Sequence, residues 1–227
     1  MSIRLSSVSV RLGDVDVLHD VSLDLDARTV AVIGENGSGK STFARLLGGL
    51  VAHSAGELRI LGLNPAKQSA ELRRRIALVF SNPDSQIVMP TVAEDVAFSL
   101  RAERLRADDL RERVVVELER FGLTALAEHA SHDLSGGQKQ LLALCGAFVR
   151  RPELVIADEP TAYLDARNAR RVAGHLFEDA GHRLVLVTHD LELAARCDLA
   201  VLFAGGTVAA VGEPAAILAE YETILKC

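Results

Sequence analysis

The chain has 227 residues, of which 49% are hydrophobic, so it is long enough to bury a sizeable core. Its net charge of −6 and aromatic content of 4% disfavour a nucleic-acid surface, which needs basic patches and stacking side chains. No apolar stretch reaches the roughly 18 residues of a membrane-spanning helix, and the N-terminus lacks the apolar segment of a signal peptide. Three cysteines without C-x-x-C spacing (Cys145, Cys197 and Cys227) favour a reducing compartment. We therefore expect a cytoplasmic protein that reaches a membrane only through partners.

The first part of the chain predicts strands that lead into a glycine-rich loop. Residues 3–25 alternate apolar and polar side chains, which is typical of antiparallel strands, and 58–61 is expected to join them. We expect these strands to lie beside residues 29–33, an apolar, β-branched segment typical of a buried parallel strand. Residues 34–41 then read Gly-Glu-Asn-Gly-Ser-Gly-Lys-Ser, which fits the P-loop pattern G-x-x-x-x-G-K-[ST].

The P-loop motif predicts a nucleoside triphosphate site. Its glycines let the backbone approach a ligand closely, and successive N–H groups at the start of a helix over 40–50 form an anion nest. Lys40 is expected to reach the β- and γ-phosphates, and the Ser41 hydroxyl to ligate Mg²⁺. The residues predicted to hold the nucleotide here are Gly34, Asn36, Gly37, Ser38, Gly39, Lys40 and Ser41.

The middle of the chain predicts helices inserted between strands. Residues 75–80 read as a core strand, and from about Val92 to Val149 the apolar positions follow helical spacing. Asp108 and Asp109 offer N-caps for one helix, which is expected to end before Gly122. Leu-Ser-Gly-Gly-Gln at 134–138 precedes a nine-residue apolar stretch. We expect one α/β domain over 1–227, with approximately 1–84 and 153–227 as one lobe and 85–152 as a helical lobe.

Two later apolar segments end in chemically active side chains. Residues 154–157 precede Asp158 and Glu159, at the edge where open α/β sheets bind ligands, and Asp158 fits a carboxylate that holds Mg²⁺. Residues 184–188 precede His189, and a strand over 207–211 and a helix over 213–225 follow. From these residues alone, a solvated acid pair and a structural histidine remain alternatives.

In this order, the P-loop, the Leu-Ser-Gly-Gly-Gln motif, the acidic pair and the histidine resemble ATP-binding cassette (ABC) ATPases over essentially the whole chain. The resemblance implies a P-loop NTPase core with a mixed sheet, an antiparallel β subdomain and an inserted helical lobe. It implies that Thr42 supports the α-phosphate, that Glu159 is the general base and that His189 contacts the γ-phosphate. It also implies a homodimer, or a pair of ABC ATPases, around two ATP molecules. Across that dimer the motif residues would contact the other subunit's γ-phosphate; they are Ser135, Gly136, Gly137 and Gln138.

Residues 79–98 resemble a narrower group, the ATPases of energy-coupling-factor (ECF) importers of vitamins or transition-metal ions. The resemblance rests on Asn-Pro-Asp-Ser-Gln at 82–86 and implies a transmembrane coupling subunit and a substrate-binding membrane subunit as partners. The short chain favours the biotin importer among them. An acidic rim of Asp84, Glu94 and Asp95 around the apolar residues 87–89 and Val92 is expected to dock a partner helix that presents an arginine. The alternative is a solvated loop followed by a capped helix after Thr91.

Three positions depart from the family pattern. Ser81 stands where the family has a glutamine that contacts Mg²⁺ and water, and Gln86 is not expected to replace it. Leu12 stands at the adenine-stacking position, where aliphatic contact replaces aromatic stacking. Tyr163 stands in the D-loop, 161–165, where a small residue is usual. The alternatives to an ECF motor are therefore the ATPase of another ABC transporter class and a weakly hydrolysing, ATP-switched regulatory subunit.

Overall fold

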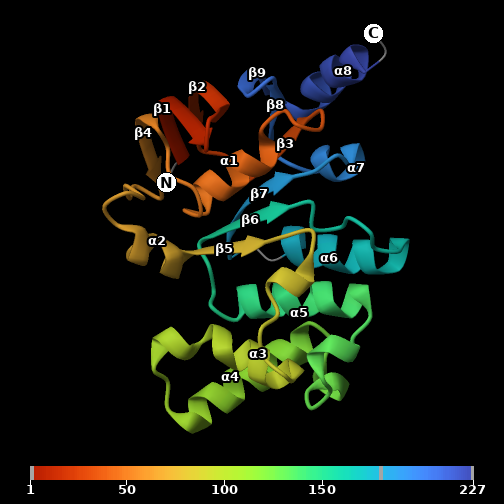
Figure 1. Cartoon of the computed structure of the whole chain (residues 1–227). Helices are drawn as coiled ribbons and strands as arrows, with labels where there is room; N and C mark the ends of the chain where they lie inside the picture. The colour runs from red at the N-terminus through yellow and green to blue at the C-terminus, as the bar shows by residue number, and fades with distance from the viewer. Residues whose placement is uncertain (1–2, 179–180, 226–227) are drawn as a thin grey trace. The chain divides into compact units, whose positions relative to one another are not determined.

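The chain is described by a computed structural model that covers residues 3–178 and 181–225. It divides into two compact units (Figure 1). The first consists of Met1–Ile76, Glu153–Glu159 and His182–Cys227, and the second of Ala77–Pro152 and Pro160–Gly181. Cys145 and Cys197 are buried free thiols, whereas Cys227 lies outside the described residues.

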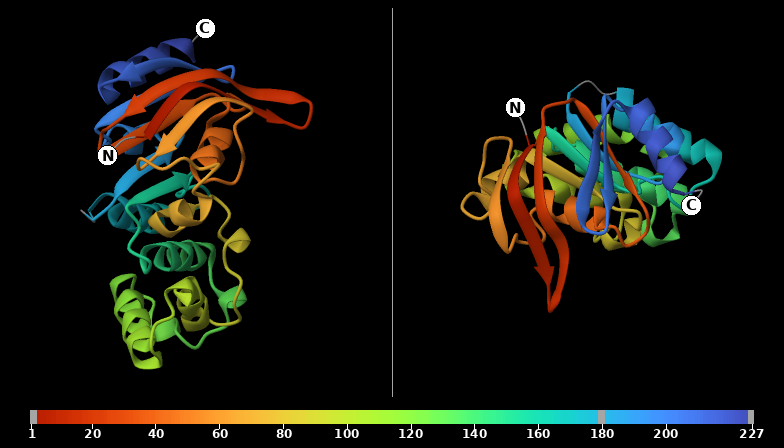
Figure 2. Two further views of the ribbon diagram at one scale, coloured as in Figure 1. Left: turned by 90° about the vertical axis from the view of Figure 1, so that its left-hand side faces the viewer. Right: turned by 90° about the horizontal axis from the view of Figure 1, so that it is seen from above.

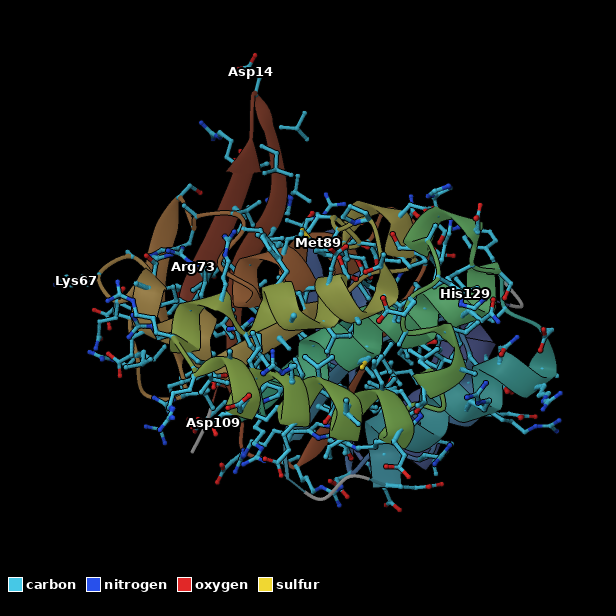
Figure 3. The ribbon with its side chains drawn as sticks, turned by 90° about the horizontal axis from the view of Figure 1, so that it is seen from below. Asp14, Lys67, Arg73, Met89, Asp109 and His129 are labelled. Atoms are coloured by element: carbon cyan, nitrogen blue, oxygen red, sulfur yellow. The ribbon has the colours of Figure 1, made fainter. Side chains whose placement is uncertain are left out.

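The first unit contains an antiparallel sheet of three strands in the order β2-β1-β4. Its strands are β1 (Ile3–Leu12), β2 (Val15–Leu25) and β4 (Ala55–Ile60). They are antiparallel, as predicted, and they form a sheet of their own, which is the expected antiparallel β subdomain. The β1–β2 hairpin extends past the rest of this sheet (Figure 2), and Asp14 lies at its tip (Figure 3).

The second sheet of this unit carries the strands that end at the site. Its order includes β6-β7-β3-β8-β9, in which only β9 is antiparallel to its neighbour. The strands are β3 (Thr29–Gly34), β6 (Leu154–Asp158), β7 (Arg183–Val187), β8 (Leu199–Ala204) and β9 (Thr207–Gly212). Every residue of β3 is buried, which explains why this segment lacks polar alternation.

Four helices complete the first unit. Helix α1 (Lys40–Leu47) contacts strands of both sheets. The Phe43 ring lies 5.0 Å from the Phe203 ring of β8. This helix ends before the predicted Leu50, at Gly48 and Gly49, and Gly49 has a φ of 68°. The others are α2 (Ser69–Arg75), which the sequence analysis missed, α7 (Leu191–Ala194) and α8 (Pro214–Ile224).

The second unit is helical. Strand β5 (Ile76–Val79) leads into it, one residue shorter at each end than predicted. Its α-helices are α3 (Val92–Ser99), α4 (Ala107–Arg120), α5 (Gly136–Phe148) and α6 (Ala166–Glu178). Short 3₁₀ turns join them: η1 (Pro83–Ser85), η2 (Arg101–Glu103), η3 (Thr124–Leu126) and η4 (Ser131–Asp133). Helix α5 is buried along most of its length and contacts α3, α4 and α6.

The start of α4 differs from the prediction. Arg106 is its N-cap residue, without a side-chain capping bond, and Asp108 and Asp109 lie within the first turn. Asp109 lies on the outer side of the helix (Figure 3). Carboxylates in the first turn still stabilise the helix, because its N-terminus carries partial positive charge. Among the described residues, no helix is both long enough and apolar enough to cross a membrane.

Candidate active site

The P-loop begins at Gly34, the last residue of β3. The backbone geometry at this position admits only glycine. Gly34 has a φ of 143°, and a Cβ there would lie 2.2 Å from the carbonyl oxygen of Phe203 on β8. Gly37 (φ 81°) and Gly39 (φ 102°) also adopt positive φ. Gly39 is the N-cap of α1 and makes no side-chain capping bond, so the first N–H groups of α1 are not capped by a side chain. The loop can therefore present backbone donors to an anion.

Lys40 is folded back onto this loop. Its Nζ donates to the carbonyl oxygens of Gly34 and Glu35, each at 2.7 Å, and the residue is buried. Burial lowers the pKa of Lys40, and the nearby carboxylates of Glu159, Asp158 and Glu35 oppose that shift. Two of the three ammonium donors are thus engaged, and the third can serve a phosphate oxygen.

Asp158 and Ser41 are joined by a hydrogen bond. The Ser41 hydroxyl donates to Asp158 Oδ1 over 3.1 Å, which joins the first turn of α1 to the end of β6. Burial raises the pKa of Asp158, whereas the bond from Ser41 opposes the shift. A hydroxyl and a carboxylate are hard oxygen donors of the kind that Mg²⁺ prefers. The pair therefore fits the cation that accompanies a nucleotide.

Glu159 and His189 lie together at the same sheet edge. Glu159 has a φ of 51°, a left-handed conformation that is uncommon for a non-glycine residue, and its N–H donates to the Val187 carbonyl. His189 Nδ1 lies 2.7 Å from Glu159 Oε2, and the histidine side chain is 71% exposed. A carboxylate thus lies next to an accessible imidazole, an arrangement that can hold and deprotonate a water molecule.

Ser38 provides a direct test of whether a phosphate fits. Its Oγ is buried and has no hydrogen-bond partner among the described residues. A buried hydroxyl without a partner costs about 1–3 kcal/mol, which a ligand oxygen would offset. Of the other predicted ligands in the loop region, Thr42 is buried, Asn36 is exposed, and Leu12 is 39% exposed beside the β1–β2 hairpin tip.

The Leu-Ser-Gly-Gly-Gln motif starts helix α5 of the second unit. Ser135 Oγ accepts from the Gln138 N–H, and Gln138 Oε1 accepts from the Ser135 N–H, which completes a capping box. The two glycines differ in their surroundings. A Cβ on Gly136 would meet nothing within 4 Å, whereas one on Gly137 would lie 2.4 Å from the Asn168 side chain of α6.

Asn168 was not identified from the sequence. Its Nδ2 donates to Asp165 Oδ2, and its backbone N–H donates to Asp165 Oδ1. The motif helix is therefore packed against the residues that follow the D-loop. The available signal was Asp165 followed three residues later by Asn168 at a helix start, but it does not reveal the contact with Gly137.

Ser81 lines a cavity of about 490 Å³ in the second unit, with Asp84, Lys139 and Tyr163 also on its wall. Gln86 does not replace the missing glutamine, because its side chain accepts from the Phe80 N–H and donates to the Leu78 carbonyl. Tyr163 has a φ of 63° and is 98% exposed. The loop thus accommodates the unusual tyrosine by directing it into solvent.

The predicted acidic rim is only partly exposed. Asp95 is buried, and its Oδ1 accepts from the N–H groups of Val88 and Met89, so its inclusion in the rim was wrong. Glu94 is exposed and forms a capping box with Thr91, while Asp84 accepts from Lys139 Nζ at 2.8 Å. Val88 is 61% exposed. Two carboxylates therefore remain on this surface.

The chain is similar to known proteins over most of its length. A family model described as ABC transporter matches residues 18–162. The biotin transport ATP-binding protein BioM of Rhizobium etli is 35% identical over 99% of each chain. The energy-coupling factor transporter ATP-binding protein EcfA1 of Lacticaseibacillus paracasei is 37% identical over 92% of this chain and 77% of its own length.

Solved structures give the same result for the fold. That of cbiO1 from Clostridium perfringens, described as part of the ABC transporter complex cbiONQ, has a TM-score of 0.86 and 30% identity. The match covers 99% of this chain and 93% of that one. A dimeric post-hydrolysis structure of the cassette MJ0796, bound to ADP and Pi, has a TM-score of 0.82 and 26% identity over 93% of this chain and 98% of its own. The predicted fold, a P-loop core with mixed and antiparallel sheets, is confirmed.

The contact between Gly137 and Asn168 predicts unequal effects of two neighbouring substitutions. Gly137→Ala should lower the free energy of unfolding by about 1–2 kcal/mol, because the new methyl group displaces Asn168 from Asp165. Gly136→Ala is the matched control and should leave stability level or slightly higher, since open space surrounds its Cβ. Urea denaturation measures both. In an Asn168→Ala background, Gly137→Ala should cost little stability, because the side chain that its methyl group would displace is absent. A cost in that background equal to the cost in the wild type would refute the contact.

Proposed function

The chain belongs to the ABC transporter family as an ATP-binding, ATP-hydrolysing subunit, and we propose that it drives an importer of the energy-coupling-factor type. The observation that carries the catalytic part is the meeting of Lys40, Ser41, Asp158, Glu159 and His189 at one edge of the sheet in the first unit. The substrate class rests on the names of similar proteins and on residues 82–86. Biotin is the favoured cargo because the similarity to BioM extends over 99% of each chain.

The proposed chemistry assigns one task to each side chain. The P-loop N–H groups and Lys40 hold the β- and γ-phosphates, and Ser38 supplies its unpartnered hydroxyl. Ser41 and Asp158 hold Mg²⁺, which when bound neutralises charge that develops on the phosphate oxygens. Glu159 accepts a proton from the attacking water, whose oxygen bonds to the γ-phosphorus as the bond to the β-phosphate oxygen breaks. His189 orients that water and contacts the γ-phosphate.

The proposed assembly is a pair of cassettes around two ATP molecules. The likeness to the dimeric structure of MJ0796 supports a homodimer or a pair with another ABC ATPase. In such a pair Ser135, Gly136, Gly137 and Gln138 contact the γ-phosphate on the facing P-loop, where the N-terminus of α5 favours an anion. A transmembrane coupling subunit and a substrate-binding membrane subunit complete the importer and place this chain at the membrane. We also propose that two lobes move during the cycle. One consists of approximately residues 1–84 and 153–227, and the other of residues 85–152.

Glu159→Gln should abolish turnover while ATP binding persists. The amide keeps the shape of the side chain but cannot accept the proton, so a loss of about 10²–10⁴-fold in turnover is expected. The variant should form a stable ATP-bound dimer, detected by size-exclusion chromatography. Lys40→Ala is the contrasting variant and should lose nucleotide binding itself, measured by calorimetry. Turnover of Glu159→Gln at the wild-type rate would remove Glu159 from the role of base.

Ser81 decides between a motor and a weakly hydrolysing switch. If its hydroxyl acts through a water molecule, Ser81→Ala should slow steady-state hydrolysis and leave ATP affinity nearly unchanged. Ser81→Gln should keep or raise turnover, because the cavity of about 490 Å³ beside it has room for the longer side chain. Negligible wild-type hydrolysis would favour the switch. A folded but inactive Ser81→Gln variant would instead mean that the site is built around serine.

The exposed carboxylates near η1 and α3 predict where the membrane partner docks. Asp84→Arg should weaken capture of a coupling subunit that presents a basic helix, because the substitution reverses an exposed charge beside the apolar Val88. Glu94→Gln removes a second charge but keeps the capping-box geometry. The ATPase activity of the isolated subunit should persist in both.

Asp109→Arg on α4 is the matched control for a reversed surface charge, and pull-down of the copurifying membrane proteins is the measurement. Capture and transport that are undiminished in both test variants would place docking elsewhere. A large permease as the copurified partner, instead of a small coupling protein, would favour another ABC transporter class.

A further inference from the structure

A surface cavity of about 630 Å³ in the second unit, open to solvent, is lined mainly by exposed cationic side chains that the candidate active site does not use. Its wall consists of Arg120 at the end of α4 and, on α6, Arg167, Arg170, Arg171, Gly174, His175 and Glu178. The α6 residues recur at intervals of three and four, so they form one stripe along the helix. We propose that this stripe is a binding site for a small soluble ligand that carries a pyrophosphate group.

The position of the arginines on α6 is costly without such a ligand. Arg167 lies in the first turn, where the helix carries partial positive charge and a cation is unfavourable, and Asp165 at the helix start offsets part of this cost. Arg170 and Arg171 follow in the second turn, and all three side chains are exposed. They are also spaced so that their like charges repel. Within residues 3–178 and 181–225 the Arg170 guanidinium makes no hydrogen bond or ion pair, and only Glu178 contributes a carboxylate to the cavity wall. A doubly charged phosphate group would relieve both unfavourable terms.

Gly174 is a second, independent indication that a ligand occupies this cavity. A glycine inside a helix is about 1 kcal/mol less favourable than alanine. No close packing explains it, because a Cβ here would meet only the Glu178 carboxylate, 3.7 Å away. Its effect is to leave the middle of the stripe open, so that a ligand can approach the backbone of α6 between Arg170 and Glu178.

The walls of the cavity are held in place. Arg171 donates to the Phe121 carbonyl at the C-terminal end of α4, and Arg120 donates to Glu117. The His175 ring stacks on Phe121, with centroids 4.0 Å apart. Burial and the two neighbouring arginines, Arg120 and Arg171, lower the pKa of His175 to about 4, so the imidazole is neutral at pH 7 and can donate or accept a hydrogen bond.

The shape and charge of the cavity favour a small anion over a macromolecule. Its volume is that of a small-molecule site, and the net charge of −6 disfavours a long polyanion. Arginine binds phosphate oxygens in bidentate geometry, and two adjacent phosphates match guanidinium groups one turn apart. Glu178 would accept from a hydroxyl or amino group of the same ligand, which points to phosphorylated metabolites such as nucleoside diphosphates.

Binding is tested with inorganic pyrophosphate by calorimetry. The Lys40→Ala background is used because it weakens competing binding at the P-loop. Arg167→Ala with Arg170→Ala should weaken pyrophosphate binding about tenfold or more. Gly174→Leu should do the same without changing charge, because its side chain fills the cavity. The matched control, Arg106→Ala with Arg111→Ala on α4, removes two positive charges outside the cavity and should bind like the parent.

Three results would overturn the site. They are no pyrophosphate binding by the parent, equal binding by all variants, and binding that falls with the arginine substitutions but not with Gly174→Leu, which would indicate diffuse charge attraction. Anionic phosphatidylglycerol vesicles test the other source of phosphate groups. Vesicle binding that depends on Arg167 and Arg170, without pyrophosphate binding, would assign the arginines to a lipid surface instead.

The site would also influence hydrolysis, and this consequence rests on the proposed function. Helix α6 directly follows the D-loop and carries Asn168, which contacts Gly137 of the motif helix. In otherwise wild-type protein at saturating ATP, pyrophosphate should change turnover, whereas Gly174→Leu should keep basal turnover and lose this response. Binding without any effect on turnover would refute the regulatory consequence and leave the site standing. Absence of basal ATP hydrolysis by the wild-type protein would instead count against the proposed function.

Discussion

The register of three neighbouring parallel strands is the constraint on which the catalytic site depends. Asp158 at the end of β6 pairs with Val187 of β7, and Val187 pairs with Val32 of β3. The residues that follow these positions are therefore brought to one edge of the sheet. A one-residue slip of β6 would turn Asp158 to the opposite face and away from Ser41. The apolar burial that fixes strand register thus also fixes the distances between the side chains of the candidate active site.

Features that depend on local backbone conformation could be predicted from the sequence. The glycines of the P-loop predict positive φ angles, and Gly34 and Gly39 adopt them. The apolar segments around Val32, Ile156 and Leu186 predict buried strands, and these three residues are buried. Asp158 and Glu159 follow such a segment, so their place at the sheet edge required only the rule that parallel strands end together. Each of these inferences uses fewer than ten consecutive residues.

Features that depend on side-chain contacts, and not on the backbone conformation of a segment, could not be predicted. Asp95 was expected in an acidic rim around apolar residues, but it is buried because the loop before α3 donates the Val88 and Met89 N–H groups to its carboxylate. Gly136 and Gly137 are equivalent in sequence, yet only Gly137 faces Asn168, about thirty residues later in the chain. The order β2-β1-β4 within the antiparallel sheet was likewise not predicted, since alternation predicts a strand but not its neighbour.

Both units contain charges that the described residues balance incompletely. In the first, burial raises the pKa of Asp158, so the ionised form is disfavoured and a cation would restore it. In the second, Arg167, Arg170 and Arg171 carry like charges at neighbouring positions of α6, and Asp165 at the helix start offsets only part of their repulsion. A ligand that binds only the folded chain stabilises it by mass action. Each imbalance is therefore a cost in the free chain and a source of affinity for a ligand of opposite charge.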